Sequence, residues 1–500
     1  MFLNRLGVLT AMKAIRTAAS RSRVAMCNSL LLAFSMGLAP AVVSAAGVSS
    51  ADYPSIHAAI DENPGGIINI PPGDHPISAP LVIRHDGTVV EGFGRIMQTN
   101  AEAPIIRIDH ADNVVVRDLT LCRPAEAAET NQAGVYAEQC HFLRLEGLRV
   151  TDNWTRFAAI RLQGSSNGLI EKCHITNYKR VSVDDRTASP LLGYAFRCID
   201  GTGIGVSDCA ATSILNNRII EHRLLPTREK MKEHKLGELI DGQVPTKFGE
   251  LGLWVQRAGV AKHWHQGSAI AVTGPESTTF TRISGNYIEN SAQGIDIHSD
   301  NFICTENIVN HGMMGMKAMH GSRNGIIARN VFSHVDNWGI MLGPGTASHP
   351  AELATDDKPE RRVNADGGII ISGNVISDFG GGHEFWNWAS DDADKAVPAV
   401  IRIERGQLAT NPPLSDVLIE GNIITNSGDE GTVEDGEVRH PKPRYRYNVL
   451  IDTAPSGSGE THYPTNIRIV DNLFDPGLDG ICNVPIPEHS AVNGAETAYR

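Results

Sequence analysis

The sequence predicts an all-β protein, a single-stranded right-handed parallel β-helix (a solenoid) with an N-terminal capping helix and long loop insertions. A short motif recurs at intervals near 22 residues, and its apolar and polar residues alternate with period two, as half-buried strands require. The motif reads apolar-x-apolar-x-Gly/Asp-Asn-x-apolar, with its asparagine at Asn286, Asn307, Asn330, Asn374, Asn422 and Asn472. A chain of 500 residues exceeds an ordinary compact domain but suits a solenoid, in which each coil contacts only its neighbours.

The recurrent asparagine predicts a specific turn. Each copy of the motif is a strand, a tight turn and another strand, so the asparagine should lie at the same turn in every coil. There its amide can bond the backbone and stack on the next asparagine, because neighbouring coils lie about 4.8 Å apart. A leucine-rich repeat has a similar period, but its leucine consensus is absent.

Composition sets the broad class. Hydrophobic residues make up 41% and charged residues 20% of the chain, which is typical of a globular protein. Lys and Arg number 44 against 57 Asp and Glu, for a formal net charge of −13, which argues against a general nucleic-acid binder.

Residues 1–45 are expected to be a signal peptide rather than part of the fold. They contain five basic residues and no acid, then the apolar run SLLLAFSMGLAPAVVSAA, which ends in the small-residue pattern Val43-Ser44-Ala45. Its removal would leave residues 46–500 as the β-helix domain, exported to the periplasm or the medium, with a net charge of −18. The alternative is a membrane anchor. No later segment is long and apolar enough to cross a membrane.

The first residues of the predicted domain are expected to form a helix that caps the N-terminal end of the solenoid. In DYPSIHAAIDENPGGIINIPPGDHPI, Ile56 and Ile60 lie four apart on a short helix, which a glycine turn and an apolar strand follow. A solenoid needs its open end covered, and this helix is expected to cover it.

Four segments break the period and are expected to be insertions, at residues 222–266, 344–366, 380–397 and 425–447. Loops on a rigid scaffold often carry binding residues, and tryptophan faces suit sugar rings. Four of the six tryptophans fall in these insertions: Trp254, Trp264, Trp386 and Trp388. The alternative is that each tryptophan packs its own loop.

Aligning the strands SAIAVT, GIDIHS, GMKAMH, GIMLG, AVIRIE and NVLID predicts which side chains share a face. Inward positions would be Ile270, Ile295, Met316, Ile340 and Ile401. One outward column would be Ala271, Asp296, Lys317, Met341, Arg402 and Leu450. The adjacent outward column would be Thr273, His298, Met319, Gly343, Glu404 and Asp452.

These columns predict a catalytic groove. His298 is the leading base, Lys317 a carboxylate neutraliser or second base, and Asp296 an orienting group or cation ligand. His320, at the end of the strand that carries Lys317, is the fourth candidate catalytic residue. Residues expected to bind substrate are Arg402, Glu404, Arg405, Asp336, Trp338, His383, Glu384, Trp386 and Trp388. The alternative is a surface ladder of ion pairs, Asp296 with Lys317 and Arg402 with Glu404.

The N-terminal part of the predicted domain resembles a known superfamily. The short helix, GGxIxIPPGxxxI and then GTVVEGFG are similar to the start of the pectin-lyase-like right-handed parallel β-helix superfamily, and the likeness spans most of residues 50–485. It implies the fold, while the superfamily holds lyases, hydrolases, epimerases and phage tail proteins.

Two partial resemblances concern the groove. GIDIHSDN followed by GMKAMHG is similar to the Asp-Pro-His-Asp signature of alginate C5-epimerases at Asp296 and His298, with Ile297 and Ser299 at the other two positions. KAMHGSRNGIIARNVF resembles calcium-dependent lyases of the chondroitinase B and alginate-lyase type, with Met319 where that family has Arg.

The expected function is therefore that of a secreted carbohydrate-active enzyme, a polysaccharide lyase that cleaves a uronic-acid-containing polymer by β-elimination. A uronate C5-epimerase, a glycoside hydrolase using Asp296 with Asp336 or Glu404, and a non-enzymatic carbohydrate-binding or adhesive β-helix are the alternatives. The expected partner is an acidic polysaccharide or oligosaccharide, not nucleic acid, and the sequence does not fix the oligomeric state.

No cofactor or metal site is indicated by residue spacing. Calcium is an open alternative, because Asp356-Asp357 and the acids at 391, 392 and 394 lie in polar loops. Seven cysteines remain after residue 45 and none forms a CxxC pair, so a cysteine-built zinc site is not expected. Cys198 and Cys209 could pair, or the thiols could be buried in the core.

Overall fold

The computed structural model describes residues 47–184, 195–238, 240, 265–355, 358–380, 397–425, 432–434, 437–439, 443–452 and 463–485. These all belong to one compact unit, Gly47–Arg500. A second unit, Met1–Ala46, holds the expected signal peptide and lies outside the described residues. Among the helices that are described, none has the length and apolar character needed to span a membrane.

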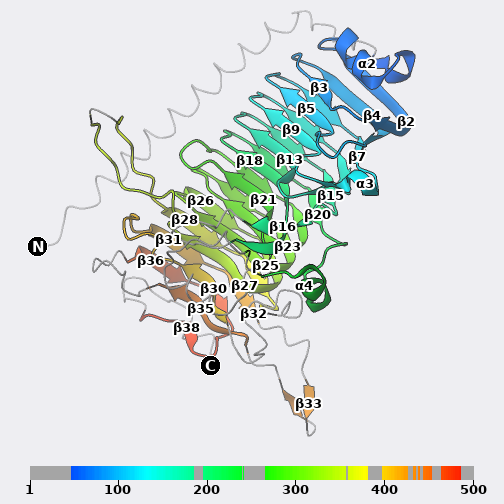
Figure 1. Ribbon diagram of the computed structural model, residues 1–500. Helices are drawn as coiled ribbons and strands as arrows, with labels where there is room; N and C mark the ends of the chain where they lie inside the picture. The colour runs from blue at the N-terminus through cyan, green and yellow to red at the C-terminus, as the bar shows by residue number, and fades with distance from the viewer. Residues whose placement is uncertain are drawn as a thin grey trace, which may run out of the picture. The chain divides into compact units, whose positions relative to one another are not determined.

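Three ladders of parallel strands run along the solenoid, and each coil adds a strand to each ladder (Figure 1). The ladder that carries the candidate site is called the site sheet. In order it comprises β3 (Leu81–Ile83), β5 (Ile106–Asp109), β9 (Val135–Glu138), β13 (Ala158–Gln163), β18 (Thr202–Ser207), β21 (Ser268–Thr273), β23 (Tyr287–Ile297), β25 (Ile308–Met319), β27 (Val331–Gly343), β30 (Val397–Ile403), β35 (Tyr445–Ile451) and β38 (Gly480–Cys482).

The second ladder precedes the asparagine turn. It comprises β1 (Val48–Ser49), β2 (Ile67–Ile77), β4 (Val89–Gln98), β6 (Val115–Arg117), β10 (Arg144–Glu146), β14 (Leu169–Glu171), β19 (Ser213–Leu215), β22 (Arg282–Ser284), β24 (Ile303–Thr305), β26 (Arg323–Ala328), β28 (Gly367–Ser372), β31 (Ser415–Glu420) and β36 (Thr465–Val470).

The third ladder follows that turn. It comprises the ends of β2 and β4, then β7 (Thr120–Cys122), β11 (Arg149–Thr151), β15 (His174–Thr176), β20 (Arg218–Ile220), the first halves of β23, β25 and β27, then β29 (Val375–Ser377), β32 (Ile423–Thr425) and β37 (Leu473–Phe474). The long strands β23, β25 and β27 bend into the site sheet, where Gly294 and Gly315 allow the backbones to approach, because a Cβ at either would collide with the next coil.

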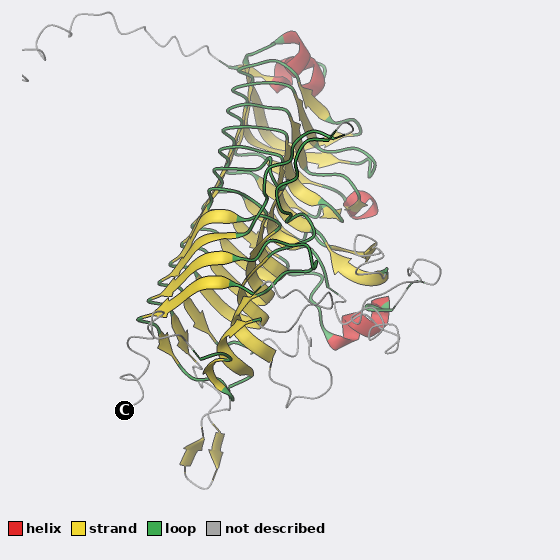
Figure 2. Ribbon diagram, turned by 90° about the vertical axis from the view of Figure 1, so that its left-hand side faces the viewer, coloured by secondary structure: helices red, strands yellow, loops and turns green. Residues whose placement is uncertain are grey.

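The remaining elements lie outside the ladders. They are η1 (Ser50–Asp52), α2 (Ile56–Glu62), α3 (Ala125–Ala128), α4 (Arg228–His234), the paired β8 (Glu129–Thr130) and β12 (Trp154–Thr155), and the antiparallel pairs β16 (Arg180–Asp184) with β17 (Phe196–Asp200) and β33 (Thr432–Glu434) with β34 (Glu437–Arg439). The right-handed parallel β-helix that the sequence predicts is thereby confirmed (Figure 2).

Helix α2 closes the N-terminal end of the core, as expected. Ser55 caps it by accepting a hydrogen bond from the backbone N–H of Ala58, and Ile56 and Ile60 are buried against the first coils. The four-residue spacing of the two isoleucines places both on the face that contacts the core.

The recurrent asparagine forms the predicted ladder. Asn307 donates from its backbone N–H and from Nδ2 to Oδ1 of Asn330, at 3.0 Å each, and the same pair of bonds links the other rungs. The rungs run through Asn217, Asn286, Asn307, Asn330, Asn374, Asn422 and Asn472. Each internal Nδ2 also donates to a backbone carbonyl, so these buried amides are satisfied by one another and by the backbone.

The core inside the ladders is apolar. The inward positions Ile270, Ile295, Met316, Ile340 and Ile401 are fully buried. The seven cysteines of the described residues are free thiols, and all but Cys482 are buried, so Cys198 and Cys209 do not pair.

Candidate active site

The outward columns of the site sheet have the register that the sequence alignment predicts. Ala271 pairs with Asp296, Asp296 with Lys317, and Lys317 with Met341. Met341 then pairs with Arg402, and Arg402 with Leu450. Because the strands are parallel and adjacent, the side chains of this column lie one coil apart on the outer face of the sheet.

Asp296, Lys317 and His298 converge. One carboxylate oxygen of Asp296, Oδ2, lies 3.2 Å from Nζ of Lys317, and the other, Oδ1, lies 3.0 Å from Nε2 of His298. The three side chains are only 12–17% exposed. The Asp296–His298 contact is close but out of line for a hydrogen bond, so neither atom has a hydrogen-bond partner among the described residues.

Electrostatics keep Asp296 ionised. Burial alone would raise its pKa, but the ammonium of Lys317 and the imidazole of His298 outweigh burial and hold the pKa well below its usual range. A carboxylate that stays charged beside a histidine can orient the ring and stabilise the imidazolium that forms when the ring accepts a proton.

His320 is the second histidine of the site. Its ring packs edge-on against that of His298, with centroids 4.3 Å apart. The backbone N–H of Ala347 donates to Nδ1 of His320 at 3.2 Å, so the neutral ring carries its proton on Nε2. Burial, with His298 and Lys317 nearby, lowers the pKa of His320 to about 3, which keeps the ring neutral at ordinary pH.

A buried carboxylate fixes the turn that presents His320. Oδ1 of Asp366 accepts hydrogen bonds from the backbone N–H groups of Gly321 and Ser322, and Oδ2 accepts one from the hydroxyl of Ser348 at 2.6 Å. Burial raises the pKa of Asp366 to about 7, although these three donors oppose the shift. His320 itself has a positive φ of 63°, a conformation that such external bonds help to hold.

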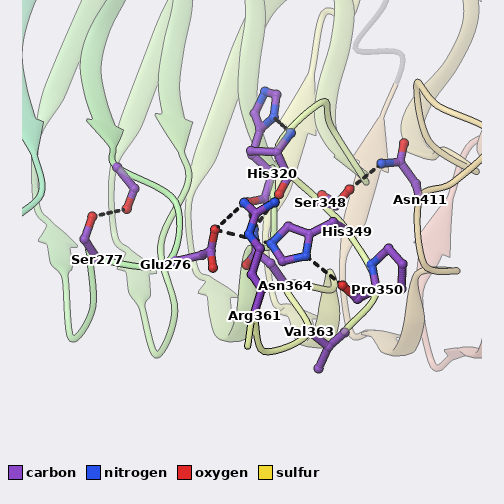
Figure 3. A network of polar contacts seen from close by, with 12 residues as sticks. Glu276, Ser277, His320, Ser348, His349, Pro350, Arg361, Val363, Asn364 and Asn411 are labelled. Atoms are coloured by element: carbon purple, nitrogen blue, oxygen red, sulfur yellow. Dashed lines mark hydrogen bonds and ion pairs between the residues drawn. The ribbon is translucent and has the colours of Figure 1, made fainter. Parts of the chain in front are cut away.

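The loops after β27 and β30 complete this support (Figure 3). Nδ2 of Asn364 donates to the carbonyls of His320 and Ala347, and Nδ2 of Asn411 donates to the carbonyls of Gly345 and Ser348. Gly345 passes so close to His320 that a Cβ there would collide with the ring. Asp366, Asn364 and Asn411 are not among the predicted site residues, because their partners lie far along the chain and no local motif marks them.

Part of the expected insertion 344–366 is a hairpin that reaches back three coils, to the turn after β21. His349 pairs with Asn364 and Glu352 with Arg361 in antiparallel bridges. The carboxylate of Glu276, in the turn after β21, lies 2.8 Å from the Arg361 guanidinium and 3.3 Å from Nε2 of His349 (Figure 3). The hairpin that holds His320 is therefore tethered at its outer end as well.

Arg402 and Glu404 lie further along the same face. Their side chains form an ion pair at 3.0 Å and are 21–23% exposed. Burial raises the pKa of Glu404, and Arg402 opposes that shift. Arg405 pairs with Asp452 at 3.5 Å in the next coil.

Two other predicted residues are buried differently from the expectation. Trp338 is only 8% exposed and packs in an apolar cluster with Met314 and Met341. The guanidinium carbon of Arg402 lies 5.4 Å from the centroid of its ring. Trp338 therefore does not offer an open face on which a sugar could stack. Asp336, expected in a turn, is a buried residue inside β27, where the register shifts against β25. His383, Glu384, Trp386 and Trp388 lie outside the described residues.

Within the described ranges, no group of three or more His, Cys, Asp or Glu residues is arranged to hold a metal ion. The acidic residues considered for calcium, Asp356-Asp357 and those at 391, 392 and 394, lie outside those ranges.

Comparison with known proteins supports the fold. No family model matches the chain, and no curated protein matches its sequence. Among solved structures, the A-module of a mannuronan C-5 epimerase from Azotobacter vinelandii is similar with a TM-score of 0.50 and 12% identity, over 88% of this chain and 96% of that one. An alginate lyase in complex with a trisaccharide gives a TM-score of 0.44 at 12% identity, over 86% and 85% of the two chains. The catalytic domain of an α-1,3-glucanase in complex with nigerose gives 0.45 at 11% identity, over 92% and 71%. The predicted resemblance to parallel β-helix proteins is confirmed at the level of the fold.

Proposed function

We propose that this chain is an exported carbohydrate-active enzyme that cleaves a uronic-acid-containing polysaccharide by β-elimination. One observation carries the proposal: a single ionised carboxylate, Asp296, contacts both a histidine and a lysine on the outer face of a rigid sheet. The similar solved structures include proteins whose names give alginate lyase and mannuronan epimerase activities, which agrees with this substrate class.

The roles follow from which atoms are engaged. Nε2 of His298 faces Asp296, so Nδ1 is the nitrogen that takes the proton on the carbon next to the uronate carboxylate. The Lys317 ammonium has three donors and uses one on Asp296, so the others can bind the uronate carboxylate and make that proton more acidic. The Nε2–H of neutral His320 can donate a hydrogen bond to oxygen as negative charge develops.

The step balances without a co-reactant. The C–H electron pair forms the new carbon–carbon double bond while the bond from the neighbouring carbon to the glycosidic oxygen breaks. The proton taken by His298 passes to the leaving oxygen, which restores the starting state of the enzyme. Asp296 stabilises the imidazolium between these two transfers.

Hydrolysis fits the geometry less well. It requires two carboxylates about 5–9.5 Å apart. Glu404 lies three coils beyond Asp296, which places the two carboxylates on the order of 14 Å apart at the usual strand spacing. Asp336, the other candidate partner, is buried inside a strand.

Epimerisation is the second candidate, because the structurally similar A-module is named as that of a mannuronan C-5 epimerase. It needs a proton donor on the face of the sugar opposite His298, whereas His320, whose ring packs against His298, lies on the same side. This alternative shares the base and the lysine and differs in whether the glycosidic bond breaks.

The first experiment is to incubate the purified mature protein with alginate, polygalacturonate and chondroitin sulfate, with and without calcium. The ultraviolet absorbance of the unsaturated product is followed for wild type, His298→Ala and Lys317→Ala. We expect a rise on one polymer, and a loss of about 100-fold or more in both variants. Arg144→Ala, in the second ladder, is the matched control and should behave as wild type.

Other outcomes identify the competing functions. Solvent hydrogen entering an uncleaved polymer would establish epimerisation, and new reducing ends without unsaturation would establish hydrolysis. Binding to a polymer without any chemical change would place the protein among carbohydrate-binding β-helices.

A further inference from the structure

The outward column that holds Asp296 continues towards the N-terminal end of the site sheet. Arg107 pairs with Tyr136, Tyr136 with Arg161, and Arg161 with Gly205. Gly205 pairs with Ala271, which pairs with Asp296. Arg107, Tyr136 and Arg161 are all partly exposed on the face that carries the candidate site, and we call them the Arg–Tyr–Arg stack.

The stack is ordered by its own contacts. The guanidinium carbons of Arg107 and Arg161 each lie 5.6 Å from the centroid of the Tyr136 ring, one from the preceding coil and one from the following coil. Stacking of this kind restricts a long, flexible side chain, so that its N–H groups face outward in a fixed arrangement. A site that is ordered before binding loses less conformational entropy when a ligand arrives.

The two arginines differ in charge compensation. Nε of Arg107 lies 2.7 Å from the carboxylate of Asp109, and its Nη2 lies 3.8 Å from that of Glu138. Arg161 instead donates to the neutral amide of Gln163 at 2.7 Å, and it forms no ion pair with any residue that the structure describes. Arg161 is therefore the member of the stack whose charge is available to an anion.

Small residues connect the stack to the candidate site. Between Arg161 and Asp296 the column holds only Gly205 and Ala271, both partly exposed. Three coil steps at the usual spacing give a separation on the order of 14 Å. No bulky side chain of this column stands in the path of an extended ligand that follows the sheet.

We propose that the Arg–Tyr–Arg stack is a distal subsite for an acidic sugar unit of a chain bound at Asp296, His298 and Lys317. Arg161 binds the carboxylate through its forked N–H groups, and Tyr136 holds the arginine in place and presents its hydroxyl. The subsite rests on the proposed function of the groove. It predicts that affinity depends on the length of the ligand, because only a chain long enough to pass Gly205 and Ala271 reaches Arg161.

The competing explanation is that the stack only stabilises the coils. Arg144 provides the comparison, because it also pairs with the residue two positions on, Glu146, but lies in the second ladder and away from the site sheet. A structural role would make Arg144→Gln and Arg161→Gln equivalent in stability and in binding.

The test measures binding of saturated oligo-uronates of increasing length, by calorimetry, to wild type, Arg161→Gln, Tyr136→Ala and Arg144→Gln. The oligomers come from whichever polymer wild type binds. We expect wild-type affinity to rise at the length that spans the distance to Arg161, and Arg161→Gln to bind that oligomer about 10-fold or more weaker, because it loses a hydrogen bond to a charged group. Thermal melting of each variant checks that it is folded, and Arg161→Gln, which keeps a polar surface side chain, remains informative where Tyr136→Ala is destabilised.

The outcomes separate this inference from the proposed function. A length-dependent rise that Arg161→Gln leaves unchanged overturns the subsite while the catalytic proposal stands. A rise that Arg161→Gln removes, in a protein that forms no unsaturated product, supports the subsite and overturns elimination. If no oligo-uronate of any length binds wild type, both are overturned.

Discussion

Two stacks of polar side chains run through neighbouring coils of this solenoid, and they are built in opposite ways. The asparagine ladder repeats one residue type, and every amide is bonded to the next one and to the backbone. The outward column of the site sheet changes residue at each coil, from Ala271 to Asp296, Lys317, Met341 and Arg402. Its contacts include ion pairs, and two of its polar atoms, Oδ1 of Asp296 and Nε of Arg402, have no hydrogen-bond partner among the described residues.

The difference shows how a repeat protein separates stability from chemistry. A repeated, mutually satisfied side chain stabilises adjacent coils equally and offers nothing to a ligand. A column whose residue type changes from coil to coil places different chemical groups about one strand spacing apart. Some of their hydrogen-bond donors and acceptors stay available to a ligand. Substitutions in the first stack should therefore affect folding, and substitutions in the second should affect activity.

The largest effect is expected from Asn330→Ala in the middle of the ladder. It leaves two buried donors of Asn307 without acceptors, so we expect a loss of about 4 kcal/mol in the free energy of unfolding, measured by chemical denaturation. Asn472→Ala, at the partly exposed last described rung, is the control. It also removes the acceptor of two donors, those of Asn422, but water can reach this rung and replace the lost oxygen, so the loss should be about 1 kcal/mol. Equal losses at the two positions would contradict the expectation that burial of a rung decides how much it contributes.

Asp296→Asn should show the reverse pattern. The amide keeps the volume of the side chain but cannot stabilise an imidazolium, so we expect kcat to fall about 100-fold. Because Asp296 is not part of the asparagine ladder, the denaturation midpoint of Asp296→Asn should change far less than that of Asn330→Ala. A stability loss as large as that of Asn330→Ala, with activity retained, would show that the column is an ion-pair ladder without catalytic function.

Substitution of Asp366 should affect both stability and activity, because its buried carboxylate holds the turn that presents His320. Asp366→Ala removes the acceptor of two backbone N–H groups, and we expect it to lose about 2 kcal/mol of stability and about 10-fold in kcat. In Asp366→Asn the amide oxygen can accept both hydrogen bonds, so this variant should keep most of the stability and most of the kcat of wild type. If the asparagine variant is as impaired as the alanine variant, the charge of Asp366 matters more than its geometry.

The pH dependence of stability follows from the raised pKa of Asp366, about 7 against 3.8. A raised folded-state pKa contributes stability that is fully present below the unfolded value and is lost as pH rises through the folded value. Denaturation between about pH 4 and pH 8 should therefore show wild type losing stability relative to Asp366→Asn as pH rises. The opposite trend would mean that its three donors keep this carboxylate ionised in the folded protein.

The smallest effect is expected at the tether of the hairpin. Burial alone would raise the pKa of Glu276, but Arg361 and His349 lower it, so this contact contributes stability above the unfolded pKa and loses it as pH falls. Glu276 is 39% exposed, and we expect Glu276→Gln to lose less than about 1 kcal/mol at pH 7. Denaturation of both proteins at about pH 3 should abolish the difference, and a difference that persists there would mean that packing rather than charge holds the hairpin.

The regular part of the molecule could be predicted from the sequence. The motif spacing, the inward isoleucines and the asparagine at each turn are local patterns that every coil repeats, so a register assigned by alignment places Asp296 beside Lys317 correctly. The same alignment places His298 and Glu404 on the outer face.

The irregular part could not be predicted. Trp338 lies near candidate binding residues in the sequence, but methionines from its own and the neighbouring coil bury it. No local sequence pattern predicts this burial. Asp366 bonds to Gly321 and Ser322, 44–45 residues earlier, across an insertion whose path the repeat does not constrain.

The coil repeat and the face to which each repeated residue belongs follow from the amino-acid pattern alone, because strand alternation and coil period are short-range properties. Three features could be read only from the folded chain: which histidine nitrogen faces Asp296, which nitrogen of His320 carries the proton, and how Asp366 holds the turn after His320. Those features depend on contacts between residues distant in the chain, and on the burial that sets their protonation, neither of which a local pattern records.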